Sequence, residues 1–323
     1  MRSDFSQKRI WITGHTGMLG SALVRSLRSN GANFFLTSRK ELDLTDRDSV
    51  LSWMRQNQPQ WIFHVAAKVG GIQANAMFPA DFLSQNLQIQ TNVIDGAHQI
   101  GAEKLVFVAS NCIYPQGSSG MIGEDALLQG APEATIKAYA ISKIAGIELC
   151  RAYQRQHGRN FISVVPPNLY GTGDNYNSQN NHVVAGIMRR AHEAAIANCG
   201  ELIIWGDGTP RREILHVDDA ASALKHVMLA ETQHDLYNIG CGHDLTITEI
   251  AQTIAEVVGF KGRLVYDATK PNGTMRKLLD NRRISALGWR AIVSEKAGLR
   301  STYSDFLQSL DRTVAARRGS GIH

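Results

Sequence analysis

The sequence lacks a long hydrophobic run, although 43% of its 323 residues are hydrophobic. No apolar stretch approaches the roughly 20 residues that span a bilayer, and the one that begins at Ile10 is broken by Gly14. The polar N-terminus, Met1 to Lys8, also lacks the pattern of a signal peptide. We therefore expect a cytoplasmic protein with no membrane partner.

Cysteine is scarce, and charge of one sign is not concentrated. Cys112, Cys150, Cys199 and Cys241 lie far apart, with no C-x-x-C pair and no histidine at zinc spacing. We therefore expect reduced thiols and no bound metal. The net charge is only +5, and the one dense basic run, at 312–318, belongs to the tail. An anionic metabolite explains this balance, whereas nucleic-acid binding is not expected without a clustered basic face or an aromatic platform.

What the sequence does contain is an alternation of short β-branched or aromatic runs with longer amphipathic stretches. The expected strands are at 9–13, 33–37, 61–66, 104–109 and 161–165, and the expected helices are at 18–30, 49–56, 82–100 and 138–157. This alternation predicts an α/β fold, a Rossmann-type doubly wound parallel sheet with helices on both faces.

After about Gly171 the alternation loosens into stretches rich in Gly, Asn, Asp and Pro. We interpret this region as a smaller, mixed α/β lobe that closes over the strand ends and binds substrate. The expected division is a nucleotide-binding domain at 1–174 with a return of about 214–245, a substrate-binding lobe at 175–213 and 246–316, and a disordered tail at 317–323. A helix at 218–229 and a strand at 236–239 form the return.

Three glycines follow the first expected strand. Gly14, Gly17 and Gly20 give the spacing G-x-x-G-x-x-G, and a helix begins within this motif. Glycines let the backbone approach a pyrophosphate, whose charge then lies against the N–H groups that open the helix. The strand–turn–helix context predicts dinucleotide binding.

The end of the second strand distinguishes the two nicotinamide cofactors. An acidic residue there binds the 2′-hydroxyl of NAD, whereas arginine suits the 2′-phosphate of NADP. The sequence reads Thr37-Ser38-Arg39-Lys40, with no acid before Glu41. We therefore predict NADP(H) as the cofactor, with Arg39 as the main contact to the 2′-phosphate.

A proton-transfer group is expected on the helix at 138–157. Tyr139 and Lys143 are four residues apart and so share one helix face. An ammonium beside a phenol favours the phenolate, so we expect a lowered Tyr139 pKa and a general acid/base. Ser110, at the carboxyl end of a strand, can hydrogen-bond the same substrate oxygen.

These motifs resemble the extended short-chain dehydrogenases/reductases and, within them, the GDP-L-fucose synthases. The resemblance runs from Gly14 to about Tyr303. It is carried by GHTGMLG at 14–20, AAKVGGI at 66–72, SNCIYP at 110–115, YAISKIAGI at 139–147, NLYG at 168–171, WGDGTPRR at 205–212 and KLLD at 277–280. It implies epimerisation of GDP-4-keto-6-deoxymannose at C3 and C5, followed by reduction of the C4 ketone with NADPH. It further implies a homodimer in which the helices at 82–100 and 138–157 pair across a two-fold axis.

The resemblance also implies a role for individual residues. Ser110, Tyr139 and Lys143 match the reductase set, while Cys112 and His182 match the acid and base of epimerisation. The expected substrate contacts are Asn168, Arg190, Trp205, Arg212 and Lys277. The expected cofactor contacts are Gly14, His15, Thr16, Gly17, Met18, Leu19, Gly20, Arg39, Asp43, Leu44, Ala66, Ala67, Lys68, Ala109, Lys143, Pro166, Asn168, Leu169 and His182.

Several alternatives stay open at this point. A 4-epimerase or a simple 4-ketoreductase has no need of Cys112 and His182, which counts against both. A relative acting on a deoxy or heptose analogue of the GDP-sugar would keep the pair. A non-catalytic NADP-sensing protein on the same fold is a rival of another class, although such proteins tend to lose the Tyr–Lys pair that is intact here.

Overall fold

The protein folds into a large nucleotide lobe and a smaller second lobe. The computed structural model describes residues 5–29, 31–117, 120–176, 182–270 and 272–319. A six-stranded parallel sheet forms the centre of the nucleotide lobe, in the order β11-β6-β4-β3-β1-β2. Its strands are β1 (Ile10–Thr13), β2 (Phe34–Leu36), β3 (Trp61–His64), β4 (Lys104–Val108), β6 (Phe161–Val165) and β11 (Leu236–Asn238).

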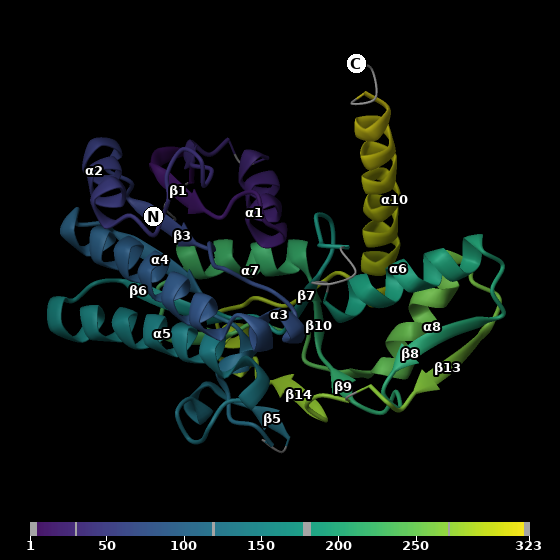
Figure 1. The fold of residues 1–323 in the computed structure, drawn as a ribbon. Helices are drawn as coiled ribbons and strands as arrows, with labels where there is room; N and C mark the ends of the chain where they lie inside the picture. Colours follow the sequence, from purple (N-terminus) through teal and green to yellow (C-terminus); the bar gives the residue numbers. More distant parts are fainter. Residues whose placement is uncertain (1–4, 30, 118–119, 177–181, 271, 320–323) are drawn as a thin grey trace.

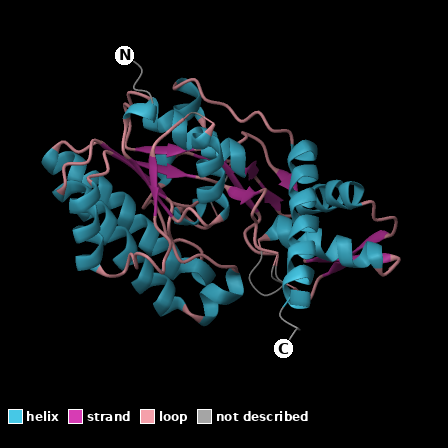
Figure 2. Cartoon of the chain, turned by 90° about the horizontal axis from the view of Figure 1, so that it is seen from above, coloured by secondary structure: helices cyan, strands magenta, loops and turns pink. Residues whose placement is uncertain are grey.

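Helices cover both faces of this sheet, as Figures 1 and 2 show. One face carries α2 (Arg47–Asn57), α4 (Pro79–Gln99) and α5 (Lys137–His157), and the other carries α1 (Met18–Arg28) and α7 (Val217–Leu229). The inner strands are buried on both sides, since every residue of β1, β3, β4 and β6 is buried. Such strands read as continuous apolar runs, which explains why the sequence pattern located them.

The sequence predictions of these elements are confirmed, with ends that differ by a few residues. The predicted strand at 104–109 ends at Val108, and the predicted helix at 82–100 begins earlier, at Pro79. Local signals set several ends: Asp46 caps α2 by accepting from the backbone N–H groups of Asp48 and Ser49, and Gly158 ends α5 in the left-handed region, at φ 64°.

The smaller lobe is built on three helices and several short strands. Its helices are α6 (Val183–Ile196), α8 (Ile247–Val258) and α10 (Glu295–Gly319), which share one apolar core with the parallel pair β8 (Glu201–Trp205) and β13 (Arg263–Asp267). A second pair joins β7 (Asn168–Tyr170) to β10 (Ile214–His216). In Figure 1, α10 extends away from the remainder of the molecule.

The chain passes between the two lobes more than once, and the expected division into lobes stays a prediction. A four-stranded sheet in the order β12-β9-β14-β5 contains β5 (Met121–Ile122) from the first half of the chain. Its other strands are β9 (Arg211–Arg212), β12 (Leu245–Thr246) and β14 (Arg276–Leu279). After β14, the helix α9 (Arg282–Ala286) returns to the nucleotide lobe, where Ile284 and Trp289 pack against the core beneath α1 and α7.

The C-terminal end differs from the expectation of a disordered tail at 317–323. The helix α10 continues to Gly319, so 317–319 are helical, and 320–323 lie outside the described residues. The remaining short segments are the 3-10 turns η1 (Phe5–Gln7), η2 (Asn111–Ile113), η3 (Glu124–Ala126) and η4 (Ala134–Ile136), and the helix α3 (Ile72–Met77). Within the described ranges, none of the helices combines the length and the apolar character that crossing a membrane requires.

Candidate active site

The glycine-rich turn after β1 forms a close-packed cradle at the start of α1. Gly14 has φ +70°, and a Cβ there would lie 2.8 Å from the backbone of Ala66. A Cβ on Gly20 would lie 2.1 Å from the Gly14 carbonyl oxygen, so both positions require glycine. Thr16 and Gly17 are exposed where α1 begins, with Gly17 as its N-cap. These N–H groups therefore fit an anionic phosphate.

Further hydrogen bonds in the nucleotide lobe fix the loop that follows β3. The Thr13 hydroxyl accepts from the backbone N–H groups of Val65 and Ala66, at 3.2 and 3.1 Å, and lies 2.9 Å from His64 Nδ1. The Asn86 side chain bonds both the N–H and the carbonyl of Lys68. Ala66, Ala67 and Lys68 consequently follow β3 at the sheet edge where the Gly14 turn lies, as expected for cofactor contacts.

His15 and His64 each carry a buried ring nitrogen without a hydrogen-bond partner among the described residues, Nδ1 of His15 and Nε2 of His64. Burial, assisted by the positive charge of Lys143, lowers the pKa of His64 to about 3, so this imidazole is neutral. His15 lies in the cradle itself. A buried polar atom without a partner is typical of a site that binds a polar ligand. The cradle thus fits a dinucleotide.

The turn after β2 places Arg39 and Lys40 in solvent. The turn is held by other residues: the Thr37 hydroxyl accepts from Trp11 Nε1 at 3.1 Å, and the Glu41 carboxylate accepts from the Ser38 N–H at 2.7 Å. Arg39 is therefore available to a 2′-phosphate. Asp43 and Leu44 follow this turn, and hydrogen bonds from Thr45, with a smaller effect of Arg39, hold the Asp43 pKa below its usual value.

Ser110 and Cys112 lie at the carboxyl end of β4. Ser110 caps the η2 turn, its hydroxyl accepting from the Cys112 N–H at 3.5 Å. Cys112 is buried, and burial raises its thiol pKa, against smaller opposing effects of the Ser110 hydroxyl and of Lys277 and Lys143. Burial therefore outweighs the two lysine charges and disfavours the thiolate.

Tyr139 and Lys143 lie on the same face of α5, as the four-residue spacing predicted. Lys143 Nζ lies 6.0 Å from the centre of the Tyr139 ring and donates to the Val108 carbonyl at 2.9 Å. Burial lowers the Lys143 pKa to about 8. The expected lowering of the Tyr139 pKa is wrong for this structure, because burial raises the Tyr139 pKa instead. The neutral phenol is the form that donates a proton.

The segment after β6 approaches the same edge from the other side. The Pro166 carbonyl accepts from the Asn111 N–H at 3.2 Å, and the Val164 carbonyl accepts from the Ala109 N–H at 2.8 Å. These bonds bring Ala109 and Pro166 together at the carboxyl ends of β4 and β6. Asn168 and Leu169, two of the expected cofactor contacts, begin β7 and are half-buried.

His182 approaches from the smaller lobe, as the N-cap of α6. It keeps an exposed surface, and partial burial of its imidazole lowers the His182 pKa below its usual value of 6.5. Among the described residues, no hydrogen bond or ion pair joins His182 to Ser110, Cys112, Tyr139 or Lys143, and the neighbouring 177–181 lie outside that set. The structure does not bring the two expected epimerisation residues into direct contact.

The expected substrate contacts of the smaller lobe form two groups. Arg190 stacks over Trp205, with its guanidinium carbon 5.2 Å from the ring centre, and donates to the Ile203 carbonyl. Arg212 and Lys277 are paired neighbours on β9 and β14, and Lys277 is near enough to Cys112 to influence its pKa. The structure thus connects Lys277 to the residues that follow β4, which sequence spacing could not do.

Comparison with known proteins places the chain within a family. Residues 10–240 match the NAD dependent epimerase/dehydratase family. The GDP-L-fucose synthase of Escherichia coli (strain K12) is 48% identical over 319 residues, which cover 95% of this chain and 99% of that protein. The chain belongs to the NAD dependent epimerase/dehydratase family. The predicted resemblance to extended short-chain dehydrogenases/reductases, and to GDP-L-fucose synthases among them, is confirmed.

Solved structures of this epimerase family share the fold over nearly the whole chain. A GDP-L-fucose synthetase from Naegleria fowleri bound to NADP has a TM-score of 0.88 at 26% identity, covering 95% of this chain and 94% of that one. A GDP-6-OMe-4-keto-L-xylo-heptose reductase from C. jejuni has a TM-score of 0.87 at 32% identity, covering 94% and 98%. The predicted Rossmann-type architecture is confirmed.

Sequence reasoning missed Glu133, which the structure places in this site. Its carboxylate accepts hydrogen bonds from the hydroxyls of Thr135 and Thr274, at 3.0 and 2.6 Å, and lies 3.7 Å from Lys277 Nζ. Its position six residues before Tyr139 was the one available signal. An acid in a turn is too common to interpret without knowing that residues 274 and 277 lie opposite it.

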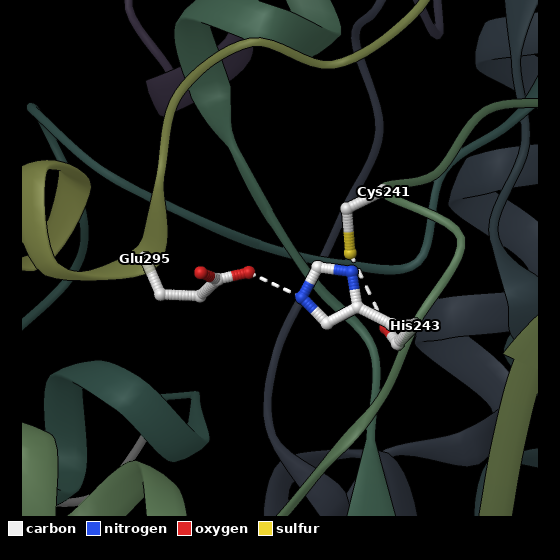
Figure 3. Close-up of side chains that lie close together, drawn as sticks. All are labelled: Cys241, His243 and Glu295. Carbon is white, nitrogen blue, oxygen red and sulfur yellow. Dashed lines mark hydrogen bonds and ion pairs between the residues drawn. The ribbon is translucent and has the colours of Figure 1, made fainter.

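A further cluster of polar side chains lies where the two lobes join, and Figure 3 shows it. The ligand atoms of Cys241, His243 and Glu295 lie within 4.8 Å of one another. His243 Nε2 is paired with the Glu295 carboxylate at 2.5 Å, while the Cys241 thiol donates to the carbonyls of His243 and Ile214. Burial, with the charge of Glu213, raises the Cys241 pKa to about 12, which disfavours the thiolate that a metal would need. We therefore assign no metal to this cluster.

Proposed function

We propose that the protein converts GDP-4-keto-6-deoxymannose to GDP-L-fucose, by epimerisation at C3 and C5 followed by NADPH-dependent reduction at C4. The observation that carries this proposal is the meeting of Ser110, Cys112, Tyr139 and Lys143 at the sheet edge that also holds the Gly14 turn. The 48% identity to a GDP-L-fucose synthase over 95% of the chain supports the same conclusion.

The cofactor we propose is NADP(H), held by the cradle at 14–20 and by Arg39. When bound, it supplies the hydride that reduces the C4 ketone. Thr16 and Gly17, at the exposed start of α1, would receive the pyrophosphate. Arg39 would pair with the 2′-phosphate, because its guanidinium fork matches phosphate oxygens.

Tyr139 is proposed as the proton donor for the C4 oxygen. As hydride reaches C4, the oxygen gains negative charge and takes the phenolic proton, leaving an alcohol and a phenolate. A raised Tyr139 pKa keeps the phenol protonated until that charge develops. Ser110 would donate a second hydrogen bond to the same oxygen, and the Lys143 ammonium would stabilise the phenolate that remains.

Cys112 and His182 are proposed as the residues that move the carbon-bound protons. The C4 ketone acidifies the hydrogens on C3 and C5, so a base removes one to give an enolate and an acid returns a proton to the opposite face. Burial raises the Cys112 pKa despite the opposing charges of Lys277 and Lys143, so the thiol is protonated and suited to return the proton. Burial lowers the His182 pKa, so its imidazole is neutral near pH 7 and suited to remove the carbon-bound proton.

The decisive test is to incubate the protein with GDP-4-keto-6-deoxymannose and NADPH and to identify the sugar formed. GDP-L-fucose is expected, with one NADPH consumed per sugar. A parallel reaction with a GDP-4-keto-heptose tests the alternative raised by the heptose reductase of 32% identity. Faster turnover of the heptose would assign the protein to that alternative.

The residue roles are separable by isotope incorporation in heavy water. Tyr139→Phe should nearly abolish NADPH oxidation while deuterium still enters C3 and C5. Cys112→Ala and His182→Ala should suppress deuterium uptake while slow reduction of the unepimerised ketone continues. Uptake at the wild-type rate in both the Cys112 and His182 variants would remove this pair from the mechanism.

We also propose that the protein is a homodimer that pairs through α4 and α5. Apolar side chains recur at helical spacing on these two helices: Leu83 and Leu87 on α4 and Ala145 on α5 are partly buried, and Ile141 on α5 is exposed. Ile141 is 40% exposed. A two-fold four-helix bundle would cover this stripe.

A cytoplasmic location is proposed as well, because the four cysteines are unpaired thiols.

A further inference from the structure

Glu133 connects the two lobes beside the site. It directly precedes η4 in the nucleotide lobe, and the helix α5, which bears Tyr139, begins directly after η4. Its contacts reach across to the smaller lobe, where Thr274 donates to the carboxylate at 2.6 Å and Lys277 Nζ lies 3.7 Å away. The side chains of Glu133 and Lys277 are only 13% and 10% exposed, so the pair is largely shielded from water.

The same loop is held from a second direction by Arg212. Its guanidinium donates to the carbonyls of Thr274 and Asn272, so Thr274 is bound through both its hydroxyl and its backbone. Lys277 and Arg212 are paired neighbours across β14 and β9. Glu133, Thr274, Lys277 and Arg212 therefore form one connected unit, to which only Glu133 contributes a negative charge.

The negative charge of Glu133 is unexpected beside the proposed substrate contacts Lys277 and Arg212, because the substrate of the proposed function carries a diphosphate. By charge alone, Glu133 would repel that anion, and its removal would tighten binding. Hydrogen bonds from Thr274 and Thr135, with the charges of Lys277 and Arg212, nevertheless outweigh burial and keep the Glu133 pKa below its usual value. Glu133 is therefore ionised at neutral pH. Its contacts indicate that the negative charge holds neighbouring side chains in place.

We propose that Glu133 is a positioning residue for the GDP-sugar: it fixes the Lys277 ammonium, and the loop that ends at Thr274, against the nucleotide lobe. This inference rests on the proposed function, because it takes Lys277 and Arg212 as substrate contacts. Without Glu133, the Lys277 side chain loses its carboxylate partner and the Thr274 hydroxyl loses its acceptor. A fixed cation loses less freedom on binding an anion than a mobile one does.

The proposal is tested with a double-mutant cycle on Glu133→Gln and Lys277→Met. Glu133→Gln keeps the shape of the side chain and one acceptor oxygen, and removes the charge together with the second acceptor. KM and kcat are measured with GDP-4-keto-6-deoxymannose and NADPH, and the Kd of GDP is measured by calorimetry on the same four proteins. Glu256→Gln is the matched control, because it removes the same charge from an exposed ion pair with Lys296 on α8 and α10.

We expect Glu133→Gln to raise KM and the Kd of GDP about tenfold or more, with a smaller change in kcat. Lys277→Met should have an effect of similar size, and adding Glu133→Gln to it should change KM less than about twofold, because the two residues act as a unit. Thr274→Val should produce part of the rise. The Glu256→Gln control should stay within about twofold of wild type.

Three results would overturn the proposal. Tighter GDP binding in Glu133→Gln would mean that charge repulsion is its only effect. Independent, multiplying effects in the double variant would mean that Glu133 does not act through Lys277. A lower melting temperature and lower kcat with unchanged KM would mean that it only supports the start of α5. If wild type fails to reduce the ketosugar, the proposed function falls, while the cycle on GDP binding still decides the role of Glu133.

Discussion

Replacing Arg39 with alanine is the sharpest test of how the chain selects its cofactor. Arg39 is exposed in the turn after β2, whereas Thr37, Ser38 and Glu41 provide the hydrogen bonds that hold this turn. The substitution should therefore leave the fold intact and remove only the cation that faces the 2′-phosphate. Because NADH has no 2′-phosphate, it should bind the variant as it binds wild type.

The expected loss follows from a single charge-assisted contact. Such a hydrogen bond contributes about 1.5–3 kcal/mol, or roughly ten- to a hundredfold in affinity. Arg39 is exposed and hence screened by salt, which places the effect near the lower end, about tenfold at 0.15 M ionic strength. The ratio of the NADH and NADPH dissociation constants should fall by the same factor.

The measurement is a titration of each reduced cofactor, followed by nicotinamide fluorescence, at low and at physiological salt. Lys40→Ala is the matched control, since it removes an equal charge from the adjacent exposed position. Equal weakening of NADPH and NADH in Arg39→Ala would refute the reasoning, because the residue would then act on the fold. An effect of Lys40→Ala as large as that of Arg39→Ala would show that general attraction, and not one contact, selects the cofactor.

Two further predictions concern assembly and stability. Light scattering at micromolar concentration should report about twice the 35.5 kDa chain mass, and Ile141→Glu on the exposed α5 stripe should shift the mass toward one chain; a wild-type monomer would contradict the dimer. Glu213 is fully buried, and burial raises its pKa to about 7, so the folded state binds its proton more tightly than the unfolded chain does. The free energy of unfolding should then decrease as the pH rises from about 4.5 to 7, and Glu213→Gln should remove up to about 3 kcal/mol of that decrease in urea titrations at the two ends. An unchanged slope would mean that Glu213 does not retain its proton.

Much of the nucleotide lobe was predictable because its signals are local. A buried parallel strand reads as a short apolar run, and the strands at 10–13, 61–64 and 161–165 were recognised in this way. The glycines at 14, 17 and 20 act within one turn, and Tyr139 and Lys143 share a face because they lie on a single helix. The roles of Ser110, Tyr139 and Lys143 followed from spacing and strand position, whereas those of Cys112 and His182 came from the resemblance to a family.

The smaller lobe was less predictable, because short strands there are stabilised by partners far away in the chain. The two residues of β5 pair with β14 more than 150 positions later, and no local pattern marks them. The division between the lobes is hard to predict from sequence for a related reason. The stretch around Ile284 and Trp289 follows the smaller lobe in sequence, yet its apolar side chains complete the core beneath α1 and α7.

By itself, the sequence determined the sheet of the nucleotide lobe, the cofactor cradle, the basic turn at Arg39 and the face that carries Tyr139 and Lys143. The strands, turns and helices that carry these features are each set by residues within about ten positions of one another. The tertiary structure decided that burial raises the Tyr139 pKa, that Lys277 lies near Cys112 and that Glu133 bridges the two lobes. Burial and charge act through space between residues that are distant in the sequence. Their effects on Glu133, Thr274 and Lys277 can therefore be predicted only from the folded structure.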